Sequence, residues 1–139
     1  MKNFNNKVAA ITGAGSGIGQ QLAVLLAKAG CHLSLSDVNE QGLQATQQLL
    51  SAYTVKVTSQ IVDVAQREQV AAWAQQTVTD HGKVNLIFNN AGVALGSTVE
   101  GMAYEDIEWL MGINFWGVVY GTKEFLPLIK QAGEGHIVN

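Results

Sequence analysis

The sequence is poor in charge and almost free of arginine. Charged residues make up 14% of the 139 residues, the formal net charge is −3, and Arg67 is the single arginine. A nucleic-acid surface needs clustered lysine and arginine, so the composition argues against a nucleic-acid partner. Apolar residues account for 47%, which indicates one globular domain rather than a disordered chain.

Cysteine and long apolar runs are also scarce. The lone cysteine, Cys31, cannot form an intrachain disulfide, which suits a reducing compartment. No run approaches the roughly 20 apolar residues of a membrane span, and the first, at residues 8–11, is too short for a secretory signal. The sequence therefore predicts a cytoplasmic protein without a membrane span. No metal site is expected, because no metal-ligand spacing links His32, His81 and His136.

Strand-like and helix-like segments alternate along the chain. Short apolar segments predict strands at residues 7–12, 32–36, 55–62 and 84–88, and the start of a fifth at 136–138. Helical periodicity lies between them, including helices at 65–81 and at 104–131, the latter bent near Asn114. Alternation of this kind gives a parallel sheet covered by helices on both faces. The expected fold is therefore α/β, a doubly wound parallel sheet in three layers (α/β/α), with residues 1–139 as a single domain.

Several residues mark the faces and ends of the expected helices. Asn39 should cap the second helix, and Gly82 should end the third. His81 precedes that end, where its charged form would suit the helix dipole. The first helix should turn one apolar stripe toward the sheet, formed by Ile18, Leu22, Leu25, Leu26 and Ala29.

A glycine-rich loop, TGAGSGIG at residues 12–19, joins the first strand to the first helix. Gly13 would permit a tight turn, Gly17 would let backbone approach a pyrophosphate, and Gly19 would allow close helix–strand packing. The helix N-terminus would offer free N–H groups to phosphate. The spacing differs from the commoner G-x-G-x-x-G, and a glycine turn without a ligand is the alternative. The context predicts a Rossmann-type dinucleotide site that includes Thr12, Gly13, Gly15, Ser16, Gly17, Ile18 and Gly19.

A carboxylate, Asp37, follows the second strand, 18 residues after Gly19. It could accept hydrogen bonds from both ribose hydroxyls of an adenosine and would repel a 2′-phosphate. Neither Ser16 nor Val38 supplies the positive charge that a 2′-phosphate needs, so NAD is favoured over NADP. The alternative is that Asp37 only closes a turn. Asp63, after the third strand, could bond the adenine amino group or cap the third helix.

Together these motifs resemble the short-chain dehydrogenases/reductases over essentially all 139 residues. The motifs that carry the resemblance are Thr12-Gly13-x-x-x-Gly17-Ile18-Gly19, Asp63-Val64, Asn89-Asn90-Ala91-Gly92, and Asn114 within GINFWGV. The resemblance implies that Val64, Asn90, Ala91 and Gly92 also border the cofactor, and that residues 89–92 stabilise the central sheet. It makes Asn114 the active-site asparagine, which holds a water in a proton relay. Without the family, Asn114 would be interpreted as a polar residue at a helix kink.

The resemblance also implies the activity and the assembly. It predicts an NAD(P)-dependent oxidoreductase that moves a hydride between the nicotinamide and a secondary alcohol or ketone, working as a homodimer or homotetramer. The long helix at 104–131 has more than one apolar stripe; one face would cover the sheet, and another would pair with a second subunit. The loop at 93–101 is expected to line one wall of the site, and its small apolar residues are compatible with a lipophilic substrate.

The family's catalytic serine, tyrosine and lysine follow the fifth strand and have no counterpart in this sequence. The fourth residues after Tyr53, Tyr104 and Tyr120 are Val57, Glu108 and Glu124, so no Tyr-x-x-x-Lys occurs. We therefore expect the chain to be the first part of a protein of roughly 250 residues, with its dinucleotide-binding domain incomplete at the C-terminus, and to be inactive alone. The alternatives are an NAD-binding or interaction module without chemistry, and a structural domain without a ligand.

Overall fold

The computed structural model describes residues 3–139, and its strands form one parallel sheet of order β3-β2-β1-β4-β5. The strands are β1 (Val8–Thr12), β2 (His32–Asp37), β3 (Val57–Ile61), β4 (Leu86–Phe88) and β5 (His136–Val138). β2 and then β3 lie on one side of β1, and β4 and then β5 lie on its other side. The strand order therefore reverses at β1, as expected for a doubly wound sheet.

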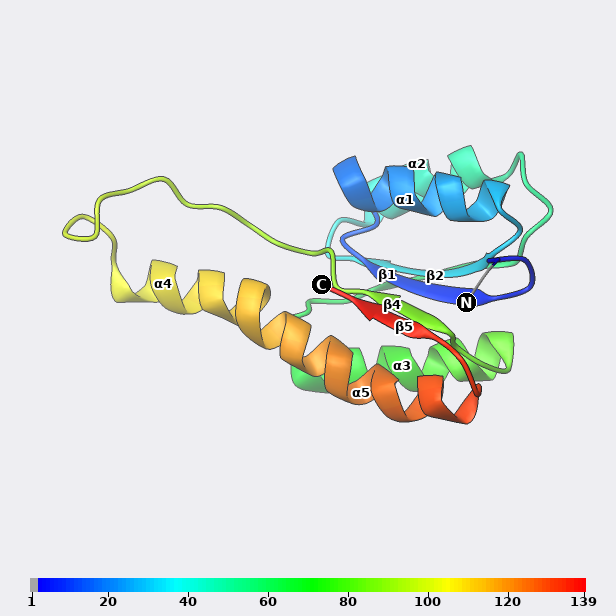
Figure 1. Ribbon diagram of the computed structural model, residues 1–139. Helices are drawn as coiled ribbons and strands as arrows, with labels where there is room; N and C mark the ends of the chain where they lie inside the picture. Colours follow the sequence, from blue (N-terminus) through cyan, green and yellow to red (C-terminus); the bar gives the residue numbers. More distant parts are fainter. Residues whose placement is uncertain (1–2) are drawn as a thin grey trace.

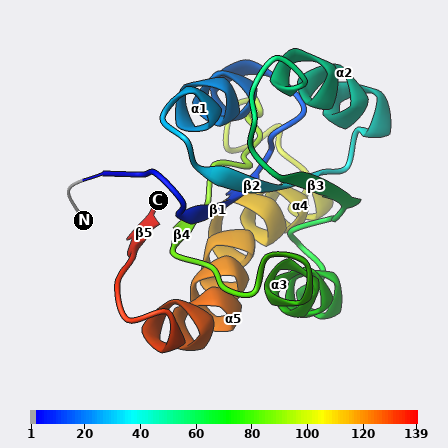
Figure 2. The same cartoon turned by 90° about the vertical axis from the view of Figure 1, so that its right-hand side faces the viewer.

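Helices cover both faces of this sheet (Figures 1 and 2). One layer holds α1 (Gly17–Lys28) and α2 (Glu40–Leu50), and the other holds α3 (Arg67–His81) and α5 (Gly117–Gln131). The side chain of Asn39 caps α2 by accepting from the N–H of Gly42 at 3.0 Å, and Gly82 ends α3 with a left-handed φ of 76°. The predicted α/β/α architecture and both of these helix-end predictions are confirmed.

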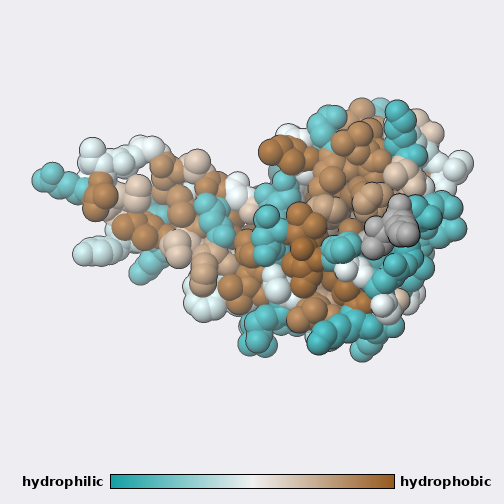
Figure 3. Space-filling view, viewed as in Figure 1, coloured by the Kyte–Doolittle hydropathy of each residue, from teal (hydrophilic) through white to brown (hydrophobic). Residues whose placement is uncertain are grey.

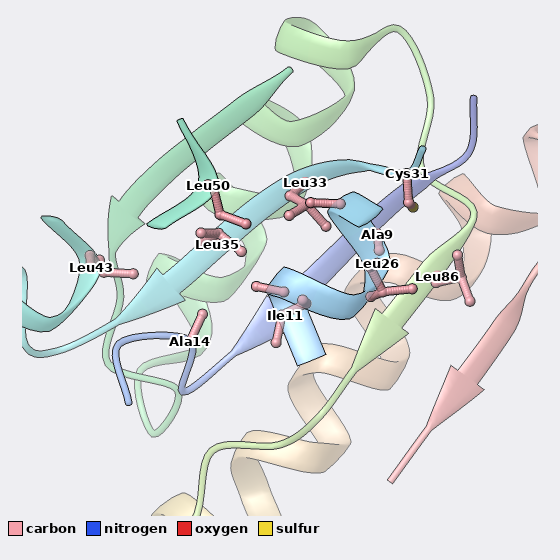
Figure 4. Packing of buried hydrophobic residues seen from close by; sticks show 12 residues of the cluster. Ala9, Ile11, Ala14, Leu26, Cys31, Leu33, Leu35, Leu43, Leu50 and Leu86 are labelled. Atoms are coloured by element: carbon pink, nitrogen blue, oxygen red, sulfur yellow. The ribbon is translucent and has the colours of Figure 1, made fainter. Parts of the chain in front are cut away.

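The core consists of two apolar layers, one on each side of β1, which is buried along its whole length. In the first layer, Ile11, Leu33 and Leu35 of the sheet meet Leu26 and Leu50 of the helices (Figure 4). The second layer centres on Trp73 of α3 and Phe125 of α5, whose rings meet edge to face with centroids 4.9 Å apart. These layers fix the carboxyl ends of the strands, where the candidate site lies.

The apolar stripe predicted for α1 is confirmed at Leu22 and Leu26, which pack in the core, and is wrong at Ile18, Leu25 and Ala29. Ile18 and Leu25 are 80% and 64% exposed, and the buried face consists of Gly19, Ala23, Leu26 and Ala27. A Cβ at Gly19 would lie 2.1 Å from the carbonyl oxygen of Gly13. The helix lies so close to the β1 turn that mainly small residues fit beneath it, and two large apolar residues face outward instead.

The long helical region is divided at the predicted place. α4 (Tyr104–Met111) leads into a π-helical turn, η1 (Gly112–Trp116), and then into α5. α4 and the preceding residues 93–103 project from the sheet as an arm (Figure 1), and no residue of α4 is buried. Within residues 3–139 no helix is both long and apolar enough to cross a bilayer.

Candidate functional site

A cleft of about 210 Å³ opens where the carboxyl ends of β1, β2 and β4 meet. In doubly wound sheets, ligands bind at this edge, beside the point where the strand order reverses. Seven of the residues predicted to hold a cofactor line the cleft: Gly13, Ser16, Asp37, Asp63, Val64, Ala91 and Gly92. Segments separated by up to 79 residues (13 to 92) are thus brought to one place.

The glycine loop has the geometry that its sequence predicts. Gly13 turns with a φ of 65°, and Gly17 has a φ of 52° with no atom within 4 Å of the position where a Cβ would stand. Gly19 lies against the carbonyl of Gly13, as described above. Ser16 precedes α1 in an extended conformation, and its side chain makes no capping bond. The first N–H groups of α1 therefore have no side-chain cap from Ser16 and are open toward a ligand.

Thr12 joins the glycine loop to the NNAG segment. Its hydroxyl accepts from the backbone N–H groups of Asn90 and Ala91, each at 2.9 Å, and lies 3.3 Å from the carbonyl oxygen of Phe88. The Asn90 amide returns bonds to the carbonyls of Thr12 and Gly13 at 3.0 and 3.3 Å. The NNAG segment thus ties the end of β4 to the end of β1, as the family resemblance implied. Thr12 itself is buried and does not line the cleft.

The carboxylate of Asp37 is held in two places at the end of β2. Oδ2 accepts from the N–H of Gly15 at 2.8 Å, and Oδ1 accepts from the N–H of Asn39 at 3.0 Å. The second bond is the turn that was the alternative explanation for this residue. A carboxylate has about four acceptor positions, so Asp37 closes its turn and keeps acceptor capacity at the cleft.

Asp63 and Val64 occupy the cleft wall that follows β3. Asp63 Oδ1 accepts from the N–H of Ala65 at 2.9 Å. The alternative in which Asp63 caps α3 is wrong, because that helix begins after Gln66. Val64 is buried and lies against Gly117, where an added Cβ would come within 2.8 Å of Val64 Cγ2. This contact sets the closeness of α5 to the cleft.

Asn114 lies in the π-helical turn and is bound to Val93. Its Oδ1 accepts from the N–H of Val93 at 2.9 Å, and its Nδ2 donates to the carbonyl of the same residue at 2.8 Å. This pair of bonds fixes the chain directly after the NNAG segment, on the rim of the cleft. π-helical turns interrupt the regular bonding of a helix and are frequent at functional sites. Asn114 therefore connects this turn to the end of the NNAG segment, and its role in a proton relay stays a prediction.

The sequence interpretation also included residues that do not line the cleft, and it missed others that do. Of the former, Ile18 and Gly17 are exposed, Gly15 and Gly19 are buried in the loop, and Thr12, Asn90 and Asn114 bond the segments around the cleft. Val93 begins the loop at 93–101 that was expected to line one wall of the site, and it does line the cleft. The lining residues that were not predicted are Val38, Val62 and Ile113. Each is the immediate neighbour of a predicted residue, so adjacency could have found them. Among residues 3–139 no three His, Cys, Asp or Glu side chains are grouped to hold a metal ion.

Curated relatives match the chain along its whole length. SadH of Mycobacterium tuberculosis, which carries an oxidoreductase assignment, is 48% identical over 100% of this chain and 50% of its own. Cyclohexanol dehydrogenase from an Acinetobacter species is 38% identical over 98% of this chain and 55% of its own. The chain thus spans about half the length of these relatives.

A solved structure and a family description agree with them. A short-chain dehydrogenase/reductase from Burkholderia phymatum, solved in complex with NAD, superimposes with a TM-score of 0.96 and 41% identity. The match covers 100% of this chain and 50% of that structure. The model of the family described as short chain dehydrogenase matches residues 7–139. The geometry of the glycine loop, the NNAG segment and the cleft agrees with these matches: the chain belongs to the short-chain dehydrogenase family.

Proposed function

We propose that the protein is an NAD-dependent oxidoreductase of the cytoplasm that interconverts a secondary alcohol and a ketone. The observation that carries the cofactor choice is the Asp37 carboxylate, which lines the cleft and is fixed by the N–H of Gly15 at 2.8 Å. The relative named cyclohexanol dehydrogenase and the family description support the reaction class. The open walls at Val93 and Ile113 are apolar, which favours a lipophilic substrate.

The residues of the cleft fit a dinucleotide. Asp37 would accept from the adenosine ribose, Asp63 and Val64 would border the adenine, and the glycine loop and the N-terminus of α1 would hold the pyrophosphate. The residues lining the cleft include two carboxylates and neither lysine nor arginine, so a 2′-phosphate would meet like charge without a partner. When bound, the nicotinamide supplies the group that gives or takes the hydride.

Asn114 would serve the chemical step by position. The two bonds to Val93 use one N–H and one acceptor position of its amide. The exposed side chain keeps a second N–H and a second acceptor position, with which it could hold a water. The 139 residues contain no Tyr-x-x-x-Lys, and no other group in the cleft is suited to protonate a ketone oxygen. We therefore propose that residues 1–139 alone bind NAD and do not turn over alcohols, which is also how an NAD-binding module would behave.

The cofactor choice is tested by fluorescence titration with NADH and NADPH. Asp37→Ala removes charged hydrogen bonds, so we expect NADH affinity to fall by about 10- to 100-fold while NADPH affinity changes little or rises. Asp106→Ala, in the first turn of α4 on the arm, removes an equal charge away from the cleft and should leave both affinities unchanged. Equal affinity of the unaltered protein for NADH and NADPH would contradict the proposal.

A further inference from the structure

Thr46 of α2 is a buried polar residue that none of the roles above requires. Its side chain is 0% exposed, and its hydroxyl lies 2.8 Å from the carbonyl oxygen of Ala14, to which it donates. The same hydroxyl lies 3.0 Å from the carbonyl of Gly42 and accepts from the Gln20 amide at 2.9 Å. Thr46 therefore joins three segments: α2, α1 and the glycine loop.

The bond to Ala14 holds the part of the glycine loop that meets Asp37. On its other side, Ala14 donates its N–H to the carbonyl of Ser36 in β2 at 3.0 Å. The next residue, Gly15, donates its N–H to Asp37. The peptide between Ala14 and Gly15 is thus fixed at its carbonyl by α2 and through its N–H by the cofactor-site carboxylate, so a rotation of this peptide would break both bonds.

Gly42, in the first turn of α2, packs against the backbone of Gly15 in the glycine loop. A Cβ at Gly42 would lie 2.7 Å from the carbonyl oxygen of Gly15 and 3.1 Å from its Cα. These neighbours are backbone atoms, so the loop itself would have to move to accommodate a methyl group. The backbone of Gly15 is consequently seated between the helix on one side and Asp37 on the other.

We propose that Thr46 is a positioning residue of the dinucleotide site. Its hydroxyl holds the Ala14–Gly15 peptide in the orientation in which the Gly15 N–H keeps the Asp37 carboxylate facing the ribose. This inference rests on the proposed NAD site and adds that discrimination between NAD and NADP depends on α2 as well as on Asp37. A residue that only supported the packing of α2 would affect stability without affecting that discrimination.

The test compares Thr46→Val with a matched control on the other face of the sheet. Thr77 of α3 is 1% exposed; its hydroxyl bonds the carbonyl of Trp73 one turn earlier at 2.9 Å and Ser34 across the interface at 2.8 Å. Thr77→Val therefore deletes the same type of buried hydroxyl far from the cleft. Both variants should lose thermal stability. Only Thr46→Val should bind NADH about tenfold more weakly, the equivalent of one lost hydrogen bond, with weaker discrimination against NADPH.

Three further variants separate positioning from packing. Thr46→Ser keeps the hydroxyl and should restore NADH affinity. Gly42→Ala raises helix propensity but pushes on Gly15, so it should weaken NADH binding even if Thr46→Val fails to fold. In the Asp37→Ala background, Thr46→Val should have little further effect on affinity, because the group through which it acts is gone.

Each opposing result has its own meaning. Unchanged NADH affinity in Thr46→Val, or equal losses of affinity in Thr46→Val and Thr77→Val, would overturn the role of Thr46 and leave the NAD site standing. If Thr46→Val lowered NADH affinity as much in the Asp37→Ala background as in the unaltered protein, this too would overturn the role of Thr46 and leave the NAD site standing. Failure of the unaltered protein to bind NADH or NADPH would overturn both the proposed function and this inference.

Discussion

His81 shows how burial can reverse what a residue's place in a helix predicts. It stands in the last turn of α3, where its charged form was expected to suit the dipole, but its pKa is lowered from the usual 6.5. Burial is the main cause and Lys56 adds to it, with a smaller contribution from His32; Asp80 opposes them. Nε2 lies 2.9 Å from Thr58 Oγ1, while Nδ1 is buried without a partner among the described residues. A proton on Nδ1 would have no acceptor, so the expectation of a stabilised charged form is wrong.

This pKa predicts that the protein loses stability in mildly acidic solution. Because the native pKa lies below the unfolded value of 6.5, the unfolded chain binds the proton first as the pH falls. The contribution of neutral His81 is therefore complete above pH 6.5 and declines below it. The measurement is the free energy of unfolding in urea at a series of pH values. In His81→Gln this free energy should change less steeply with pH just below 6.5 than in the unaltered protein. His136→Gln, at the exposed start of β5, should not show this difference; the same slope in all three proteins would contradict the assignment.

At the residue scale, the sequence predicted the groups whose local context defines them. Gly13, Gly19 and Asp37 could be interpreted from the strand–loop–helix order alone, since their roles follow from backbone turns and strand ends. Thr12 was placed in the site by its motif, but its bond to Asn90 could not be predicted, and Thr46 was not singled out at all. Both residues act by bonding segments more than 30 residues away (12 to 90, 46 to 14). Cys31 was predicted to form no intrachain disulfide. It is free and fully buried, and burial raises the pKa of its thiol to about 12.

At the element scale, the close approach of α1 to the β1 turn determines which of its residues are buried, and hydrophobic periodicity does not reveal this. The apolar spacing of α1 predicted that Ile18 and Leu25 would be buried, but periodicity weighs all large apolar residues alike. The small residues Gly19, Ala23 and Ala27 form most of the contact between α1 and the sheet instead, because the β1 turn lies too near for larger residues. The division of the long helix was predictable because Asn114 falls inside an otherwise apolar helical segment. Its π-helical form and the bonds of Asn114 to Val93 could not be predicted, because Val93 is 21 residues away in the sequence.

Gly19→Ala tests this close packing of α1. The new Cβ would lie 2.1 Å from the carbonyl oxygen of Gly13 and 2.7 Å from the Asn90 amide, so the glycine loop and helix would have to separate. We expect a loss of about 3 kcal/mol in the free energy of unfolding, the upper end for overpacking, measured by thermal or urea denaturation. Gly96→Ala is the control, since nothing lies within 4 Å of its Cβ position. A fully stable Gly19→Ala variant would show that α1 can shift without cost.

At the scale of the whole molecule, apolar surface gathers in two regions (Figure 3). One is α1, where Ile18 and Leu25 are exposed. The other is the arm (residues 93–111) with the adjoining turn η1, where Tyr104, Trp109 and Trp116 are 82%, 49% and 48% exposed. As predicted, one face of the long helix covers the sheet, through Phe125 and its neighbours. Single exposed apolar residues are ordinary, but groups of them mark contact surfaces. Because the relatives are about twice as long, we propose that further polypeptide covers α1 in the whole protein and that a second subunit covers the arm.

Association through the arm can be tested with a pair of substitutions matched in exposure. Trp109 on α4 and Leu49 on α2 are both 49% exposed. Trp109 belongs to the arm, whereas Leu49 lies in the helix layer formed by α1 and α2. If the unaltered protein is a dimer or tetramer held by the arm, Trp109→Glu would place an unpaired charge in a desolvated contact, and dimer affinity should fall by at least about 100-fold. Leu49→Glu adds the same charge outside the contact and should leave the mass unchanged in sedimentation equilibrium. A monomeric unaltered protein, or equal effects of the two variants, would exclude the arm as the subunit interface.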